Sequence, residues 1–143
     1  TEPGAPDAIW RRYGELWCEA ASNASLPYDA MSHSDLAKKF GYYPSSNLER
    51  LYDEMAEAAR AGGRMVEVNT SGAYYACAEM FPAPGLLAAF CRAGVPCTVG
   101  CDSHDPVNVA RDIERAYGLM YEAGYRSVTV PTATGDRRSI TIE

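Results

Sequence analysis

The chain has two histidines, His33 and His104, and each follows an apolar run of strand length. A third apolar run, residues 64–68, carries Glu67 in its interior and is followed by Asn69. A carboxylate among apolar strand residues must be paired, bound to a metal ion or placed at the end of the sheet. If the three runs are parallel strands, their carboxyl ends meet at one edge, so these side chains are expected to converge in one site.

Asp102 and His104 lie two residues apart after the apolar run of residues 95–100. At an extended strand end this spacing turns both side chains to the same side, where they could hold one metal ion. The alternative is that Asp102 caps the helix that Asp105 and Pro106 predict, and that His104 is an exposed side chain without a ligand. For His33 the alternative is a core or capping histidine, with Asp35 capping a short helix that follows.

The elements that must position these residues alternate along the chain. Apolar spacing and glycine or proline signals predict helices over 7–23, 47–61, 84–93 and 109–123, and strands over 28–32, 64–69, 95–100, 126–130 and 139–142. The last strand could pair back on the one before it as a hairpin. This order is typical of right-handed βαβ units around a parallel sheet, about four units here. An eight-unit barrel needs about 250 residues, so the chain is either a small open α/β sheet or part of a larger barrel.

Length and composition favour a single domain over residues 1–143, with residues 1–6 as a terminal linker. Thirteen Lys and Arg against 19 Asp and Glu give a net charge of −6, which argues against binding to nucleic acid or an anionic membrane. With no spanning apolar run or leader, a cytoplasmic protein is expected. Five cysteines without CxxC spacing indicate reduced thiols.

Three segments, in order, resemble the histidinol-phosphatase branch of the polymerase-and-histidinol-phosphatase (PHP) family. Residues 32–36, Ser-His-Ser-Asp-Leu, look like the Gly-His-x-Asp-Leu segment of that branch. Residues 67–72, Glu-Val-Asn-Thr-Ser-Gly, are similar to its Glu-Ile-Asn-Thr-(Ser/Ala)-Gly strand end, and residues 100–104, Gly-Cys-Asp-Ser-His, resemble its Gly-Ser-Asp-Ala-His. The resemblance implies the carboxyl-terminal part of a distorted, TIM-like (βα)7 barrel that hydrolyses L-histidinol phosphate in histidine biosynthesis.

The resemblance also implies roles for individual residues. Divalent metal ions (Zn, Mn or Fe) would be bound by His33, Asp102 and His104, of which Asp102 and His104 also act in catalysis. The residues implied on the substrate side are Glu67 and Asn69, which shape the same edge, and Lys39, a candidate for binding the substrate phosphate.

The sequence of this chain differs from the family pattern in two places. The opening His-x-His motif has no counterpart, and Tyr74 and Tyr75 stand where typical members carry an arginine after Asn-Thr-x-Gly. We therefore expect an inactive or nearly inactive fragment of the enzyme that binds a small phosphorylated substrate and forms a homo-oligomer or lacks an amino-terminal half. Two alternatives stay open: a non-catalytic half-barrel used for binding or structure, and a compact open-sheet domain that binds a small anion.

Overall fold

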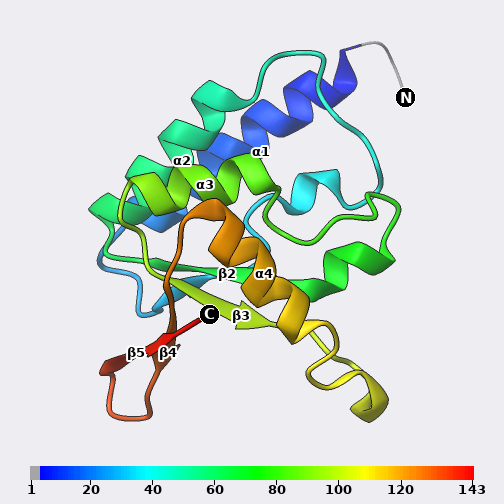
Figure 1. Cartoon of the computed structure of the whole chain (residues 1–143). Coiled ribbons are helices and arrows are strands. Elements are labelled where there is room, and N and C mark those ends of the chain that lie inside the picture. The colour runs from blue at the N-terminus through cyan, green and yellow to red at the C-terminus, as the bar shows by residue number, and fades with distance from the viewer. Residues whose placement is uncertain (1–3) are drawn as a thin grey trace.

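A computed structural model describes residues 4–143 of the chain (Figure 1). Within this part of the chain, four helices and five strands follow one another in the order α1, β1, α2, β2, α3, β3, α4, β4, β5. The helices are α1 (Ala5–Ser22), α2 (Glu49–Ala61), α3 (Pro84–Arg92) and α4 (Ile113–Ala123). The strands are β1 (Ala30–Met31), β2 (Met65–Asn69), β3 (Cys97–Gly100), β4 (Ser127–Pro131) and β5 (Arg137–Thr141). Three 3-10 helices are η1 (Leu36–Lys38), η2 (Thr70–Tyr74) and η3 (Pro106–Asn108).

The central element is a three-stranded parallel sheet in the order β1-β2-β3. Ala30 is paired with Met65, and Val66 with Cys97, so β2 lies between its two neighbours. Each crossover carries a helix, α2 between β1 and β2 and α3 between β2 and β3, as parallel connections require. The protein is therefore a mixed α/β protein with a parallel sheet.

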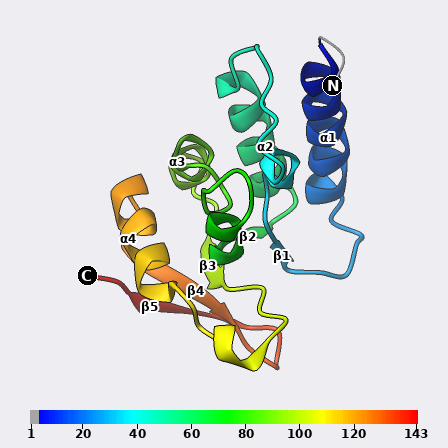
Figure 2. The same cartoon turned by 90° about the vertical axis from the view of Figure 1, so that its right-hand side faces the viewer.

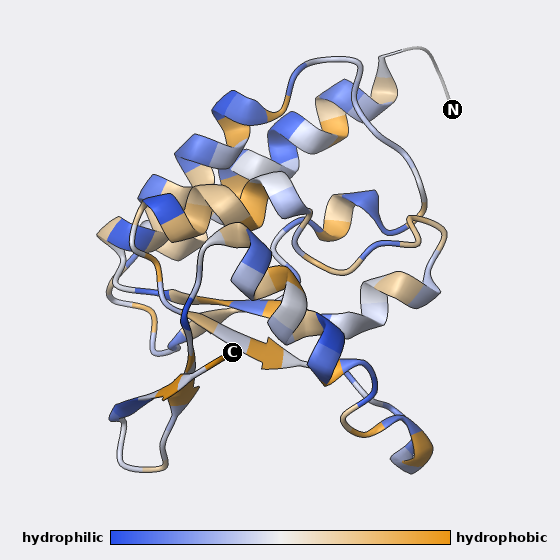
Figure 3. Ribbon diagram, in the orientation of Figure 1, coloured by the Kyte–Doolittle hydropathy of each residue, from blue (hydrophilic) through white to orange (hydrophobic). Residues whose placement is uncertain are grey.

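The main core lies between this sheet and its helices. Val66 and Val68 of β2 are fully buried, and so are Leu86 and Phe90 of α3. Because side chains alternate along a strand, Glu67 points to the opposite face. In Figure 2, α1, α2 and α3 lie on one side of the sheet. Figure 3 shows hydrophilic and hydrophobic residues alternating around the turns of these helices.

The carboxyl-terminal hairpin differs from the expected fourth parallel unit. The predicted strand over 126–130 forms β4, but β4 pairs antiparallel with β5 in a separate two-stranded sheet. The chain reverses at once through a turn in which the Thr132 amide donates to the Asp136 carbonyl, and Gly135 adopts φ 84°. No crossover helix intervenes, so a parallel pairing of these strands is not possible. The predicted hairpin is thus confirmed. β4 does not pair with β3, so the parallel sheet has three strands and the predicted fourth parallel unit is absent from it.

Two element ends also differ from the sequence prediction. The helix predicted over 109–123 begins only at Ile113, because Ala110 and Asp112 both have φ 61°, outside the helical region. At the other end of the chain, α1 begins at Ala5 and so includes the last two residues of the predicted 1–6 linker. Residues 1–3 of that linker lie outside the described part. Within residues 4–143, no helix is long and apolar enough to cross a membrane.

Candidate functional site

The loops that follow β1, β2 and β3 leave the sheet at one edge, because the three strands are parallel neighbours. His33 lies in the first loop, Asn69 ends β2, and Asp102 and His104 lie in the third loop. The predicted parallel arrangement of the three runs is confirmed. The candidate residues therefore stand on adjacent strand ends.

Glu67 is half-buried on the open face of β2, and its carboxylate lies against the backbone of Gly100 on the neighbouring strand. The Asn69 amide donates to Glu67 Oε1 at 3.1 Å. Burial raises the pKa of the Glu67 carboxyl, and the nearby charge of Asp102 adds to this rise. The carboxylate of Glu67 on β2 and that of Asp102 in the loop after β3 are therefore close enough to interact electrostatically.

Asn69 is buried and organises the end of β2. Its Oδ1 accepts hydrogen bonds from the Ser71 amide at 3.0 Å and the Ser71 hydroxyl at 2.7 Å, which caps η2. Its backbone exchanges hydrogen bonds with Phe81. Asn69 thus fixes both the Glu67 carboxylate and the first turn of the following loop.

The imidazoles of His33 and His104 differ in their surroundings. The His33 ring is half-buried and meets the Phe81 ring edge to face, with 6.2 Å between centroids. His104 is exposed, and its Nδ1 lies 2.9 Å from the Asp102 carbonyl oxygen. Because a carbonyl only accepts hydrogen bonds, Nδ1 carries the proton in this contact, which leaves Nε2 as the nitrogen able to bind a metal.

The chemistry of these donors suits zinc, manganese or iron, since imidazole and carboxylate are ligands of all three. Within residues 4–143, however, no three His, Cys, Asp or Glu side chains gather closely enough to hold one ion. The structure brings Glu67 and Asp102 within electrostatic reach of each other. It does not bring His33, Asp102 and His104 into one three-donor cluster.

Backbone strain concentrates in the same loops. Among the described residues, all non-glycine residues with left-handed φ follow β1, β2 or β3, and they are His33, Ala78, Asp102, Ala110 and Asp112. Such residues cost about 1–3 kcal/mol each and persist only where the surrounding structure holds them, often at functional sites. This observation independently singles out the carboxyl edge of the sheet.

Lys39 and Lys38 have different environments although they are adjacent. Lys39 is half-buried, and its Nζ lies 4.2 Å from the centroid of the Tyr75 ring. The Lys38 side chain is fully buried, with Nζ 2.9 Å from Asp35 Oδ2 and 2.6 Å from Glu79 Oε1. Sequence reasoning missed this cluster, because Glu79 is 41 residues away from Lys38 and no local pattern relates the two.

Asp35 is therefore not the simple helix cap that the alternative assignment predicted. Its side chain makes no capping bond to η1; instead Oδ2 accepts a hydrogen bond from the Ala83 amide at 2.7 Å. Burial raises the pKa of the Asp35 carboxyl, while the Lys38 ammonium opposes that rise. The Lys38–Glu79 ion pair and the Asp35–Ala83 hydrogen bond tie the loop after β1 to the loop after β2.

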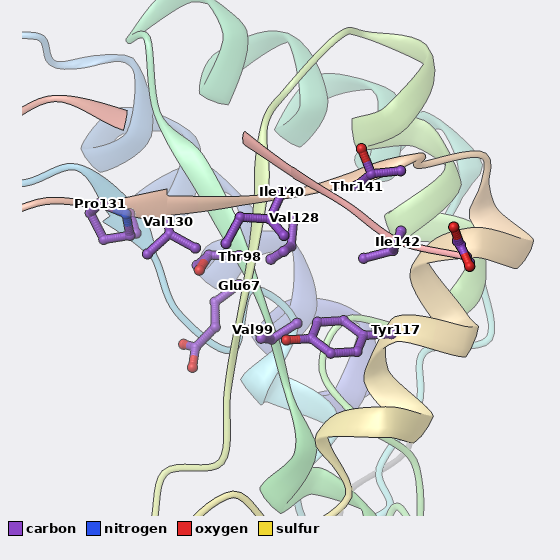
Figure 4. Close-up of a pocket in the computed structure, with 12 residues that line it drawn as sticks. Glu67, Thr98, Val99, Tyr117, Val128, Val130, Pro131, Ile140, Thr141 and Ile142 are labelled. Atoms are coloured by element: carbon purple, nitrogen blue, oxygen red, sulfur yellow. The ribbon is translucent and has the colours of Figure 1, made fainter. Parts of the chain in front are cut away.

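A cavity of about 660 Å³ opens on the Glu67 face of the sheet (Figure 4). The sheet contributes Glu67 and Thr98, α4 contributes Tyr117, and the hairpin contributes apolar side chains such as Val128 and Ile140. The hairpin therefore covers part of the sheet face that the helices leave open.

Fold and site together define a parallel α/β protein whose polar and strained residues gather at the carboxyl ends of its strands. No protein-family model matches the chain. The chain is similar to a protein of Deinococcus radiodurans named "Probable histidinol-phosphatase", with 32% identity over 121 residues. The match covers 85% of this chain and 45% of that protein, so the chain spans less than half the length of this relative. The similarity supports a histidinol-phosphatase-like relationship.

Proposed function

We propose that the chain is the carboxyl-terminal part of a metal-dependent phosphomonoester hydrolase of the PHP kind, which converts L-histidinol phosphate to L-histidinol. The similarity to the Deinococcus radiodurans protein, 32% over 121 residues, is the observation that carries this proposal. The parallel strand ends support it, because an open edge of this kind is where α/β enzymes collect their functional groups.

For the fold, we propose that the three parallel strands are part of a distorted seven-stranded TIM-like barrel. Among the described residues, β1 and β3 each pair with β2 alone, so each has one free edge. Glu67 and Thr98 face the cavity on the side away from α1, α2 and α3, as interior residues of a barrel would. Further strands on these edges would enclose that cavity.

For the site, we propose His33, Asp102 and His104 as metal ligands, with further donors from outside these residues. A bound divalent ion would supply a Lewis acid and a water of lowered pKa. The Nδ1 contact of His104 orients its ring. Asn69 holds the Glu67 carboxylate beside Asp102, and the Lys39 ammonium attracts the phosphate dianion to the same edge.

A chimera tests the proposal on a complete protein. This chain would replace the matching segment of the Deinococcus radiodurans protein, and phosphate release from L-histidinol phosphate would be measured with added Mn²⁺ or Zn²⁺. We expect the chimera to retain hydrolysis and Asp102→Asn to lower kcat at least about 100-fold. Asp136→Asn, which changes an exposed carboxylate in the hairpin turn, is the matched control and should have little effect.

Two results would overturn the proposal. One is a folded chimera with no hydrolysis when the intact Deinococcus radiodurans protein is active. The other is equal activity of the Asp102→Asn and Asp136→Asn chimeras. A folded but inactive chimera would favour the non-catalytic half-barrel.

A further inference from the structure

Arg111 is held in a defined position beside the loop that follows β2. Its guanidinium carbon lies 3.4 Å from the centroid of the Tyr74 ring, so the planar group stacks on the ring. Its Nη1 donates to Asn108 Oδ1 at 3.1 Å. Its backbone carbonyl accepts a hydrogen bond from the Thr70 hydroxyl at 2.7 Å. Because Thr70 directly follows Asn69 of β2, these contacts place Arg111 at the carboxyl edge of the sheet.

The backbone around Arg111 is strained in a way that preserves this position. Ala110 and Asp112 flank it, and both adopt φ 61°. The Tyr74 hydroxyl donates to the Asp112 carboxylate, which fixes the ring on which the guanidinium lies. Strain that the surrounding contacts maintain on both sides of one residue is typical of a side chain positioned for a ligand.

In the described part of the chain, the Arg111 guanidinium forms no direct ion pair with a carboxylate. Within residues 4–143, no Asp or Glu oxygen lies within 4.0 Å of its guanidinium nitrogens, although Asp112 is its neighbour. Asp112 is instead paired with Arg115 at 3.5 Å and with Tyr74. Only Nη1 of Arg111 donates to a described residue, so Nε and Nη2 keep their N–H groups for another acceptor.

We propose that Arg111 binds the phosphate group of the ligand at this edge, with Tyr74 and Asp112 as the residues that position it. A guanidinium offers parallel N–H donors whose spacing matches two oxygens of a phosphate, and such paired bonds are among the strongest in proteins. That this phosphate belongs to a phosphorylated substrate rests on the proposed function. The binding of inorganic phosphate by Arg111 does not depend on it.

Calorimetric titration with inorganic phosphate tests the proposal directly. The 143-residue chain would be titrated at low ionic strength with a chelator present, so that no metal ion contributes. We expect Arg111→Ala to weaken phosphate binding at least about 10-fold, since it removes a forked, charge-assisted pair of bonds. Arg12→Ala is the matched control: it removes the same charge on the exposed face of α1, where Arg12 is paired with Glu15 at 3.1 Å, and we expect a change below about 2-fold.

Two further variants keep the test valid if Arg111→Ala fails to fold. Arg111→Lys keeps the charge but loses the fork, and Tyr74→Leu keeps Arg111 but removes its stacking partner. Both should weaken phosphate binding, by about 3- to 10-fold. Circular dichroism would confirm that each variant is folded.

The proposal is wrong if the wild-type chain binds no phosphate or if Arg111→Ala and Arg12→Ala weaken binding equally. It is also wrong if the folded Arg111→Lys and Tyr74→Leu chains bind phosphate as the wild type does. Failure of the proposed hydrolase gives a different pattern. In that case the chimera would release no phosphate from L-histidinol phosphate, while the Arg111-dependent binding of inorganic phosphate would persist.

Discussion

Lys38 places a full positive charge in the interior of the protein, next to the loop that carries His33. Its ammonium contacts Asp35, Glu79 and the Met80 carbonyl at 2.6–2.9 Å. A buried ion pair adds little net stability compared with apolar residues of the same shape, but loss of one partner leaves the other charge buried and uncompensated. The cluster therefore holds the two loops in one arrangement.

Replacement of Lys38 tests this view of the cluster. We expect Lys38→Met to lower the free energy of unfolding by about 3–5 kcal/mol, because Asp35 is then buried without a cation. Lys39→Met is the matched control, since Lys39 is half-buried and forms no ion pair within residues 4–143; its cost should stay below about 1 kcal/mol. Urea denaturation would measure the free energy of unfolding of both variants. Similar losses for the two variants would contradict a structural role for the buried pair.

The hydroxyl of Tyr13 joins α1 to the same loop. It donates to the Ser34 carbonyl at 3.0 Å and accepts a hydrogen bond from the Leu36 amide at 3.3 Å. Burial raises the pKa of Tyr13 to about 12. An exposed tyrosine titrates near pH 10, so between about pH 10 and 12 the unfolded chain loses this proton while the folded chain keeps it.

This difference makes stability fall with pH in a defined window. The contribution of Tyr13 is complete below about pH 10 and is lost as the pH rises toward 12. We expect the free energy of unfolding to fall over this range and Tyr13→Phe to make the fall shallower, while costing about 1 kcal/mol at pH 7 through the lost hydrogen bonds. Denaturant unfolding at a series of pH values provides the measurement. An unchanged slope in Tyr13→Phe would exclude this contribution.

At the scale of elements, the turn from α2 into β2 depends on a close backbone approach. A Cβ atom at Gly62 would overlap the Ala21 carbonyl of α1. We therefore expect Gly62→Ala to lower the free energy of unfolding by about 2–3 kcal/mol, because backbone must move to accept the methyl group. Gly118 is a helical glycine in α4 with open space around it, so Gly118→Ala should stabilise the protein by about 0.5–1 kcal/mol. Thermal unfolding should show a lower melting temperature for Gly62→Ala and a higher one for Gly118→Ala. A lower melting temperature for both variants would contradict this account.

The helices and parallel strands were largely predictable because local signals mark them. The helix predicted over 47–61 is α2 with its end at the glycine that follows, and the helix predicted over 84–93 is α3. The helix predicted from residue 109 begins only at Ile113, and the reason is local. Ala110 and Asp112 adopt left-handed φ although neither is a glycine, so the residue types do not indicate this conformation. The pairing of β4 with β5 was suggested by the short turn between them. No local signal showed that β4 would not pair with β3, and the parallel sheet therefore has three strands.

The site was only partly predictable for a related reason. The placement of Asn69 and Asp102 on neighbouring strand ends follows from the order of the elements. The contacts of Lys38 with Glu79 and of Arg111 with Tyr74 join residues 37 or more positions apart in the sequence. Only the packing of the loops brings them together, so no spacing rule could have indicated them.

At the scale of the whole molecule, the parallel sheet has free strand edges. Within the described residues β1 and β3 pair only with β2, and β5 is exposed along its length, with Ile140 53% exposed. Free edges and exposed apolar residues favour association with further strands. We expect light scattering after size-exclusion chromatography to give at least twice the 15.5 kDa mass of one chain. A single 15.5 kDa species at micromolar concentration would contradict this expectation.

Metal content tests the central claim most directly, since the proposed function requires the strand ends to bind a divalent ion. Because further donors are proposed to come from outside these residues, the chimera with the Deinococcus radiodurans protein would be purified without chelators. Zinc, manganese and iron would then be quantified per chimera by elemental analysis. The matched comparison is the double variant His33→Ala, His104→Ala, with Asp136→Ala as a control for substitution at an exposed acidic residue. The account predicts about one ion per chimera or more, lost in the double variant and retained in the control. A chimera without metal, or equal metal in the chimera and its double variant, would contradict it.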